Sequence, residues 1–257
     1  MARRRPVARE PGRFLRYVAL DEAAAGEGYP FDLPMVAALR AKWLTLGPGV
    51  TFLVGENGTG KSTLIEGVAV AAGLNPEGGS RSFRFATRSS ESALGSALRL
   101  GRAPGRERSS FFLRAESYYN VATEMERLDA APGPGARLLP AYGGTSPHDR
   151  SHGQSFLDLL VHRFGPGGLY LLDEPEAALS TRGCLAALAR MHDLVQHGSQ
   201  FLVATHSPVL LAVPGARILE IDEDGTIEPV DFDDALPVRA TRRFLANPAA
   251  TVREVLG

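Results

Sequence analysis

The sequence lacks several features that would each point to a particular class of protein. Its single cysteine, Cys184, excludes a disulfide framework, suits a reducing cytoplasm and is expected to be a small buried hydrophobe. No run of 18 apolar residues occurs, so we expect no membrane-spanning helix. The basic residues 1–13 have no apolar segment behind them, so we expect a disordered tail and not a secretory signal.

The net charge is only −1, but the charges are unevenly distributed. Residues 81–114 contain eight arginines against two acids, whereas residues 218–234 contain eight acids and no base. An arginine-rich stretch could bind phosphate or nucleic acid, here through Arg84, Arg88 and Arg102. A solvated surface is the favoured interpretation, because arginine is the prevailing basic residue of the whole chain, which contains only two lysines.

Short apolar runs alternate with helical patterns along most of the chain. "GVTFLV", "GLYLLDE" and "QFLVATHS" are bounded apolar runs that predict buried strands, and "RYVAL" predicts a further short strand. A helical pattern follows the first run and ends at Gly73, and another begins at Ser180 as N-cap and ends at Gly198. Alternating strands and helices predict an α/β fold with a parallel sheet covered by helices on both faces.

Three other regions are assigned more coarsely. "SALGSALRL" and "YNVATEMERLD" predict short helices within a smaller helical or irregular lobe at about residues 80–165. "SHGQSFLDLLVHRF" predicts an amphipathic helix ending at Gly165. "ARILEIDEDGTIEPV" predicts a hairpin that turns at Asp224 and Gly225, and the last 22 residues predict one or two short helices.

A complete phosphate-binding pattern lies between the first buried strand and its helix. Gly55-x-x-x-x-Gly60-Lys61-Ser62 is a P-loop, whose backbone N–H groups surround phosphate at the positive end of a helix. Lys61, one of only two lysines in the chain, would neutralise the β- and γ-phosphates. The residues expected to contact a nucleoside triphosphate are Gly55, Glu56, Asn57, Gly58, Thr59, Gly60, Lys61, Ser62 and Thr63.

Two acids follow the second buried strand, at the sheet edge where ligands of parallel α/β folds bind. We expect Asp173 to hold Mg²⁺ together with the Ser62 hydroxyl, and Glu174 to act as the general base that activates water. Helix capping is the alternative role for these acids. His206 ends the third strand and is expected to sense or contact the γ-phosphate.

In this order, the P-loop, "SHGQ", "DEPE" and "THS" resemble the motifs of an ABC-type ATPase domain, over nearly the whole of residues 14–257. More closely, "TFLVGENGTGKST", "FFLRAES", "SHGQSFL" and "LYLLDEPEAALS" resemble small stand-alone bacterial ATPases described as AAA-family or ABC-like. The resemblance implies an ABC-ATPase-like P-loop fold that uses ATP and Mg²⁺. It also implies that Ser151, His152, Gly153 and Gln154 form a signature that contacts the γ-phosphate held by a second subunit.

The sequence departs from that class at two motifs. No glutamine lies between the P-loop and Ser151, so the usual Q-loop residue is missing, and Glu116 is the candidate substitute at the metal. Ser180 stands where an aspartate normally ends the loop after the Walker B strand. Tyr29 or Phe31 could stack on adenine, although each could also be a core aromatic.

The sequence therefore predicts a cytoplasmic Mg-dependent ATPase that forms an ATP-sandwiched homodimer. We expect it to act as a conformational switch in DNA repair or defence, with nucleic acid or an unknown protein as partner and without a membrane subunit. The alternatives are the energy-coupling subunit of a transporter and an ATP-dependent interaction switch that does not hydrolyse.

Overall fold

The fold is known from a computed structural model of the chain. It describes residues 12–76, 78–80, 93–115, 123, 126 and 152–256, with His152 described by its backbone alone. All structural statements below concern these residues. Residues 1–11 of the expected basic tail, residues 81–92 of the arginine-rich stretch, Glu116 and Ser151 lie outside them.

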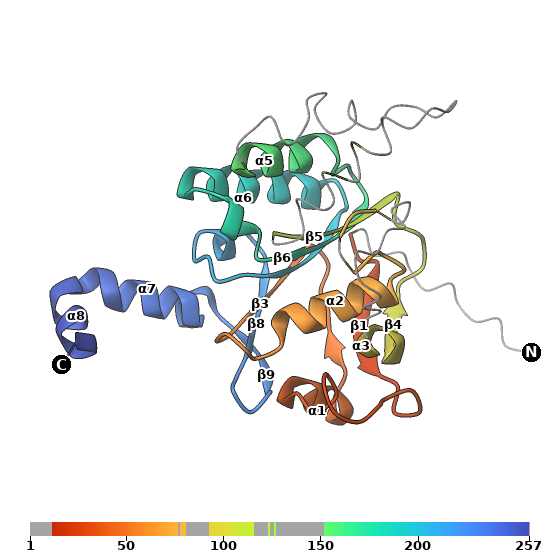
Figure 1. Ribbon diagram of the computed structural model, residues 1–257. Helices are drawn as coiled ribbons and strands as arrows, with labels where there is room; N and C mark the ends of the chain where they lie inside the picture. Colours follow the sequence, from red (N-terminus) through yellow and green to blue (C-terminus); the bar gives the residue numbers. More distant parts are fainter. Residues whose placement is uncertain are drawn as a thin grey trace, which may run out of the picture.

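A six-stranded sheet with the order β5-β6-β7-β3-β8-β9 forms the centre of the fold (Figure 1). Neighbouring strands are parallel except for the antiparallel pair β8 and β9. The strands are β3 (Val50–Val54), β5 (Ser109–Arg114), β6 (Gly168–Asp173), β7 (Gln200–Ala204), β8 (Arg217–Ile221) and β9 (Ile227–Val230). The predicted parallel α/β sheet is thereby confirmed.

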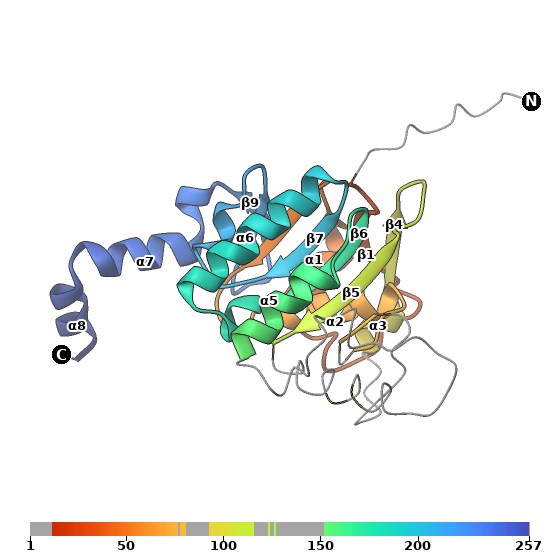
Figure 2. The ribbon, with the colours of Figure 1, turned by 90° about the horizontal axis from the view of Figure 1, so that it is seen from above.

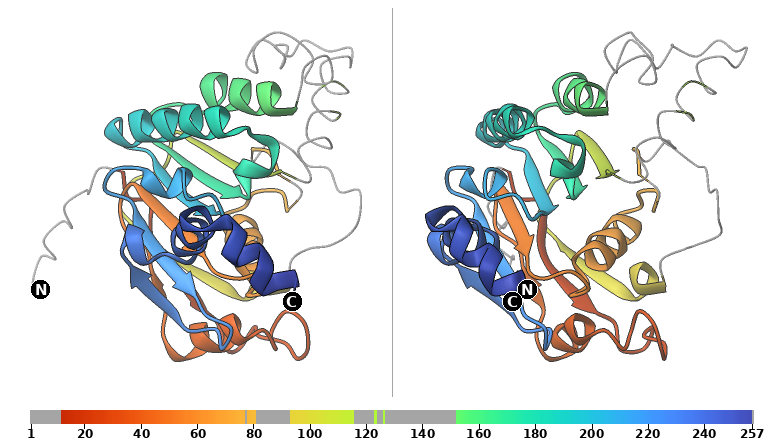
Figure 3. Two further views of the ribbon diagram at one scale, coloured as in Figure 1. Left: turned by 90° about the vertical axis from the view of Figure 1, so that its left-hand side faces the viewer. Right: turned by 60° about the vertical axis from the view of Figure 1, so that its left-hand side comes forward.

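Helices cover both faces of this sheet (Figures 1 and 3). The helices α1 (Pro34–Ala41) and α2 (Lys61–Ala71) pack on one face, and α5 (His152–His162) and α6 (Thr181–Gln196) pack on the other. Side chains alternate between the two faces with the period of a strand. In β6, Leu169 and Leu171 belong to the α2 core, whereas Tyr170 and Leu172 belong to the α5–α6 core.

A second, antiparallel sheet has the order β2-β1-β4. Its strands are β1 (Leu15–Leu20), β2 (Leu44–Thr45) and β4 (Leu98–Arg102), and α3 (Ala93–Ala97) leads into β4. The expected helix over "SALGSALRL" is therefore right only for its first part. The segment "LRLGR" begins with Leu98, Arg99 and Leu100, in which apolar and basic residues alternate with the period of a strand, and it pairs with β1.

The expectation of a helical lobe at about residues 80–165 is tested only where this range is described. Of the described residues in this range, β4 lies in the small sheet, β5 lies in the large sheet, and α5 packs on the large sheet. The rest of the range is mostly outside the described residues, including nearly all of the predicted helix over residues 119–129.

The C-terminal part follows the predicted pattern. The strands β8 and β9 form a hairpin in which Gly225 has a φ of +87°, a conformation that favours glycine. An added Cβ there would lie 2.1 Å from the carbonyl carbon of Pro34, so the turn packs directly on the start of α1. The helices α7 (Leu236–Ala246) and α8 (Pro248–Leu256) then extend away from the sheet (Figure 2). Among the described residues, no helix has the length and apolar character needed to cross a membrane.

Candidate functional site

The P-loop joins the buried strand β3 to the start of α2, as predicted. Gly55 has a φ of +147°, and a Cβ built there would lie 2.3 Å from the carbonyl oxygen of Ile221. Gly60 is the N-cap of α2 with a φ of +96°. Both positions require glycine because of backbone conformation, and Gly55 also because of close packing. Thr59 is buried and its hydroxyl donates to the Glu56 carbonyl (2.9 Å), which closes the loop on itself.

The P-loop leads directly into the first turn of α2. The first N–H groups of any helix have no partner within the helix, and the helix dipole makes this end positive. The N-cap residue, Gly60, has no side chain that could accept hydrogen bonds from these N–H groups. Glu56, Asn57 and Gly58 are exposed, so an anion has access from outside. The arrangement is suited to binding phosphate.

Lys61 is buried and its ammonium group is held by the loop itself. Its Nζ donates to the carbonyl oxygens of Gly55 (2.9 Å) and Glu56 (2.8 Å), and only 4% of the residue is exposed. Burial lowers the pKa of Lys61, and the nearby carboxylates of Glu174 and Asp173 oppose that shift. Among the described residues, the ammonium bonds to these two neutral carbonyls, which it can exchange for phosphate oxygens.

Asp173 ends β6 at the same edge of the sheet. Its side chain is buried, its Oδ2 accepts a hydrogen bond from Nε of Arg114 (3.0 Å), and its Oδ1 has no hydrogen-bond partner among the described residues. A buried, unbonded carboxylate oxygen is costly unless something else binds it. Asp173 Oδ1 and the Ser62 hydroxyl in the first turn of α2 are hard oxygen donors, the type that Mg²⁺ prefers. The residues present therefore fit a magnesium ion.

Glu174 has an unusual backbone. Its φ of +49° and ψ of 52° lie in the left-handed region, and no other non-glycine residue among those described has a positive φ. Its N–H donates to the Ala204 carbonyl of β7 (3.0 Å), and Pro175 begins a 3-10 turn (Pro175–Ala178) immediately afterwards. Residues with a side chain are rarely held in this conformation, and such strain concentrates at functional sites. The hydrogen bond to β7 and the turn Pro175–Ala178 therefore fix the position of the half-buried Glu174.

His206 lies just beyond the end of β7 and contacts the turn after Asp173. Its backbone N–H donates to Oε1 of Glu176 (2.5 Å). The Nε2 of His206 and the Oε2 of Glu176 are both buried without a hydrogen-bond partner among the described residues. Together with Asp173 Oδ1, they leave three unsatisfied polar atoms near one edge of the sheet. Glu176 is the last residue of "DEPE" and was given no role from the sequence, and its contact with His206 joins the segments that follow β6 and β7.

Arg114 and Glu66 were not predicted from the sequence. Arg114 ends β5 directly opposite Asp173 in the parallel register, and its Nη1 also bonds to Oε2 of Glu66 on α2 (2.9 Å). The motif "FFLRAES" pointed instead to Glu116, which lies outside the described residues. The strand pattern could have revealed Arg114, because "SSFFLR" places it on the same face as Phe112, toward α2.

The start of α5 lies beside the turn that follows Asp173. A Cβ added to Gly153 would lie 2.8 Å from the Ala178 carbonyl oxygen, so the two segments pack in close contact. Gln154 is exposed and donates to Asp158 (3.1 Å). A hollow of about 510 Å³ lies between the first turns of α5 and α6, with Gly153, Gln154 and Ser180 among its walls. Ser180 caps α6 by accepting from the Gly183 N–H (3.2 Å), as predicted.

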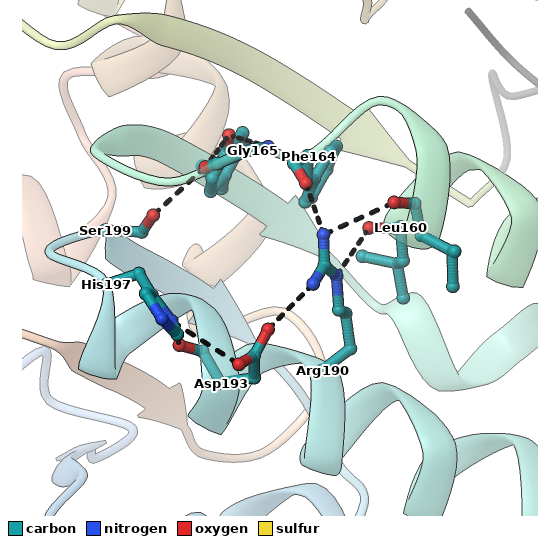
Figure 4. A network of polar contacts seen from close by, with 9 residues as sticks. Leu160, Phe164, Gly165, Arg190, Asp193, His197 and Ser199 are labelled. Carbon is teal, nitrogen blue, oxygen red and sulfur yellow. Dashed lines mark hydrogen bonds and ion pairs between the residues drawn. The ribbon is translucent and has the colours of Figure 1, made fainter.

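The other end of α5 is tied to α6 by Arg190, as Figure 4 shows. Its guanidinium donates to three backbone carbonyls at the end of α5 and in the loop beyond it, those of Leu160 (3.2 Å), Val161 (3.3 Å) and Phe164 (2.7 Å). It also donates to the carboxylate of Asp193 on α6 (2.7 Å). These carbonyls would otherwise be unsatisfied at a helix end. The loop carbonyl of Gly165 also accepts from Ser199 (3.2 Å), which fixes the loop to the β7 side. The two helices are therefore joined as one unit.

The two candidate adenine residues are placed differently. Phe31 is buried in the α2-side core and has no exposed ring face to offer. Tyr29 is 73% exposed, and its hydroxyl lies 3.3 Å from the hydroxyl of Thr63 in the first turn of α2. Of the two, Tyr29 is therefore the residue that could reach a nucleotide bound at the P-loop.

Known proteins resemble the chain in part of its sequence and in its fold. A family described as an AAA domain matches residues 38–120, which include the P-loop and β5. No curated protein matches the chain. A metal-chelate type ABC transporter in an inward-facing conformation has a similar structure, with a TM-score of 0.51 and 16% identity over 91% of this chain and 89% of that one.

Two other solved structures are more distant. A nucleotide-free ATP-binding cassette from an ABC transporter has a TM-score of 0.47 and 14% identity, over 92% of this chain and 96% of that one. The SMC head domain from Thermotoga maritima has a TM-score of 0.40 and 14% identity, over 74% and 93%.

The likeness to the first structure shows the fold, and the family match agrees with it. The chain has the fold of an ABC-type P-loop ATPase domain.

Proposed function

We propose that the protein binds ATP at the P-loop with Mg²⁺ and hydrolyses it. The observation that carries the proposal is the convergence of Lys61, Asp173 and Glu174 at one sheet edge. A buried ammonium bonded to loop carbonyls faces carboxylates that include a buried, unbonded oxygen. Structural salt bridges do not need unsatisfied atoms, whereas a site that receives phosphate and a cation does.

Lys61 and the N–H groups at the start of α2 would hold the phosphates. Lys61 would exchange the carbonyls of Gly55 and Glu56 for the β- and γ-phosphate oxygens, and the loop N–H groups would bind the same anion. Ser62 and Asp173 would hold the magnesium ion. When bound, the ion neutralises charge on the phosphates. The exposed Tyr29 ring is available to the adenine base.

Glu174 is the proposed general base. Its backbone N–H is fixed to β7, so the half-buried carboxylate is held at the sheet edge beside Lys61. From there it accepts the proton of the attacking water. His206 is fixed through Glu176, and its unbonded Nε2 is a candidate donor to the γ-phosphate.

Replacing Glu174 with Gln tests the catalytic proposal. The amide keeps the size of the side chain but cannot accept a proton, so the rate of phosphate release should fall about 100-fold or more. ATP affinity, measured by titration calorimetry, should remain within about threefold, because the binding groups are untouched. Glu223→Gln, on the exposed turn between β8 and β9, is the matched control and should leave both quantities unchanged. Undiminished release by Glu174→Gln would overturn the role of Glu174, and tight binding without turnover in the unaltered protein would favour the non-hydrolysing switch.

The second part of the proposal is an ATP-dependent homodimer. Within one chain, α5 and the P-loop helix α2 lie on opposite faces of the sheet, so the sheet separates the two helices. Gly153 and Gln154 at this start, with Ser151 and His152 before them, would instead meet the γ-phosphate on a second copy. The position of α5 supports this arrangement.

The wider process is proposed from the sequence resemblance alone. A conformational switch in DNA repair or defence, in the cytoplasm, remains the prediction, and no described contact identifies its partner. Of the three arginines suggested to contact nucleic acid, Arg102 is described, and it pairs with Glu107 (3.1 Å). That pairing favours a structural surface role for Arg102. We propose residues 14–257 as one ATPase domain.

A further inference from the structure

Arg114 connects the two elements on which the proposed metal site depends. Its Nε bonds to Oδ2 of Asp173 on β6 (3.0 Å), and its Nη1 bonds to Oε2 of Glu66 on α2 (2.9 Å). About a quarter of the Arg114 side chain is exposed, so the two bonds lie in a partly desolvated place. Charge-assisted bonds in such places are stronger than those on an open surface.

The strand register makes this contact a consequence of the fold. Arg114 is paired with Asp173 in the parallel ladder, at the last position of both strands. Phe112 faces the core on the α2 side, and with a period of two Arg114 points the same way. The guanidinium therefore lies between the carboxylate that ends β6 and the helix that carries Lys61 and Ser62.

The site is surrounded by carboxylates, and Arg114 compensates part of their negative charge. Glu174, Asp173, Glu56 and Glu176 all raise the pKa of Lys61, so the edge of the sheet is rich in acid. Arg114 bonds one oxygen of Asp173 and leaves the other, Oδ1, buried and unbonded. One face of the carboxylate is thus fixed by a permanent cation, while the other remains available.

We propose that Arg114 is a positioning residue that takes the electrostatic place of the divalent cation when no nucleotide is bound. It holds Asp173 in its binding orientation and weakens the attraction of the site for a bare cation. The metal then binds firmly only when phosphate oxygens supply further ligands, so it arrives with the nucleotide. This inference rests on the proposed function of Asp173 and Ser62.

The experiment measures binding of Mn²⁺ alone, as a magnetic probe for Mg²⁺, by electron paramagnetic resonance without nucleotide. Arg114→Gln removes the charge but keeps a polar side chain, and it should bind Mn²⁺ at least about tenfold more tightly than the unaltered protein. Arg114→Lys keeps the charge and should bind as weakly as the unaltered protein. Arg102→Gln, which breaks an ion pair with Glu107 away from Asp173, is the matched control and should change nothing.

Folding of each variant is checked by circular dichroism at the temperature of the titration. Should Arg114→Gln not fold, the double variant Arg114→Met, Glu66→Leu removes the guanidinium without leaving Glu66 unpaired, and the same tightening is expected. A folded charge-neutral variant that binds Mn²⁺ no more tightly than the unaltered protein would overturn the proposal. Equal tightening in Arg114→Lys would also overturn it, because the charge would then not be the cause.

The metal-only titration separates this inference from the proposed function. ATP binding by the unaltered protein is measured in parallel with Mg²⁺ and with a chelator. Absence of ATP binding would refute the proposed function, and tighter Mn²⁺ binding by Arg114→Gln would still establish the role of Arg114. ATP binding without any Mn²⁺ effect of Arg114→Gln would refute only the role of Arg114.

Discussion

The two faces of the large sheet carry different parts of the candidate machinery. On the α2 side, Lys61, Asp173 and Arg114 are largely buried and bonded to loop carbonyls or to one another. On the other side, α5 begins next to a hollow of about 510 Å³, and Gln154 there is exposed. In the proposed function, the first region holds the phosphates within one chain, whereas the start of α5 is proposed to act on a second copy.

The largest expected effect among the binding groups is at Lys61. Replacing it with Met removes the buried ammonium that would meet the phosphates, and ATP affinity should fall by about 3 kcal/mol, or about 100-fold. The free energy of unfolding should change little, because within the described part of the chain the ammonium is bonded to two neutral loop carbonyls. Calorimetric titration with ATP and urea unfolding measure the two quantities. Retained affinity in a folded Lys61→Met protein would show that the P-loop is not the binding site.

A smaller effect is expected on the other face, at Arg190. Arg190→Met removes the donors to the carbonyls of Leu160, Val161 and Phe164, and the free energy of unfolding should fall by about 2 kcal/mol. ATP affinity of the monomer should not change, because α2 and the P-loop lie on the opposite face. Urea unfolding checks the first quantity and calorimetry the second. Arg242→Met, which breaks an exposed pair with Asp233, is the control and should be almost neutral. A matching loss of ATP affinity in Arg190→Met would mean that the two faces are not independent.

The smallest effect is a dependence of stability on pH. Because burial lowers the pKa of Lys61 below its ordinary value of 10.5, the unfolded chain holds this proton more tightly than the folded chain. The stability of the unaltered protein relative to Lys61→Met should therefore rise as the pH increases through the lowered folded pKa toward 10.5. Urea unfolding of both proteins between pH 8 and about 10.5 measures the difference. If the stability of the unaltered protein relative to Lys61→Met fell as the pH increased, the folded state would raise the pKa of Lys61, and the account of its burial would be contradicted.

The sequence predicted the parts of this comparison that depend on local patterns. The strands β3, β6 and β7, the P-loop and the Ser180 cap follow from apolar runs, glycine spacing and capping residues, and each is confirmed in position. The short helix α1 and strand β2 were not predicted, because they are too short to show a period and are fixed by tertiary packing.

The contacts between distant segments could not be predicted in the same way. Arg114 reaches Asp173 only because β5 and β6 align Arg114 with Asp173, and the identity of neighbouring strands is not visible in the residues themselves. Glu176 reaches the backbone of His206 across the gap between two strand ends. The strand β4 was mistaken for helix, because three alternating residues, Leu98 to Leu100, gave a weak indication against the helical residues before them.

The mass in solution of Glu174→Gln, with and without Mg-ATP, tests most directly whether the signature segment of one molecule completes the nucleotide site of another. The account predicts a monomer without ATP and a dimer with it. It also predicts that adding Ser151→Arg to Glu174→Gln abolishes the dimer, whereas adding the exposed-surface change Arg242→Met preserves it. A protein that binds ATP and remains a monomer under all these conditions would contradict the account.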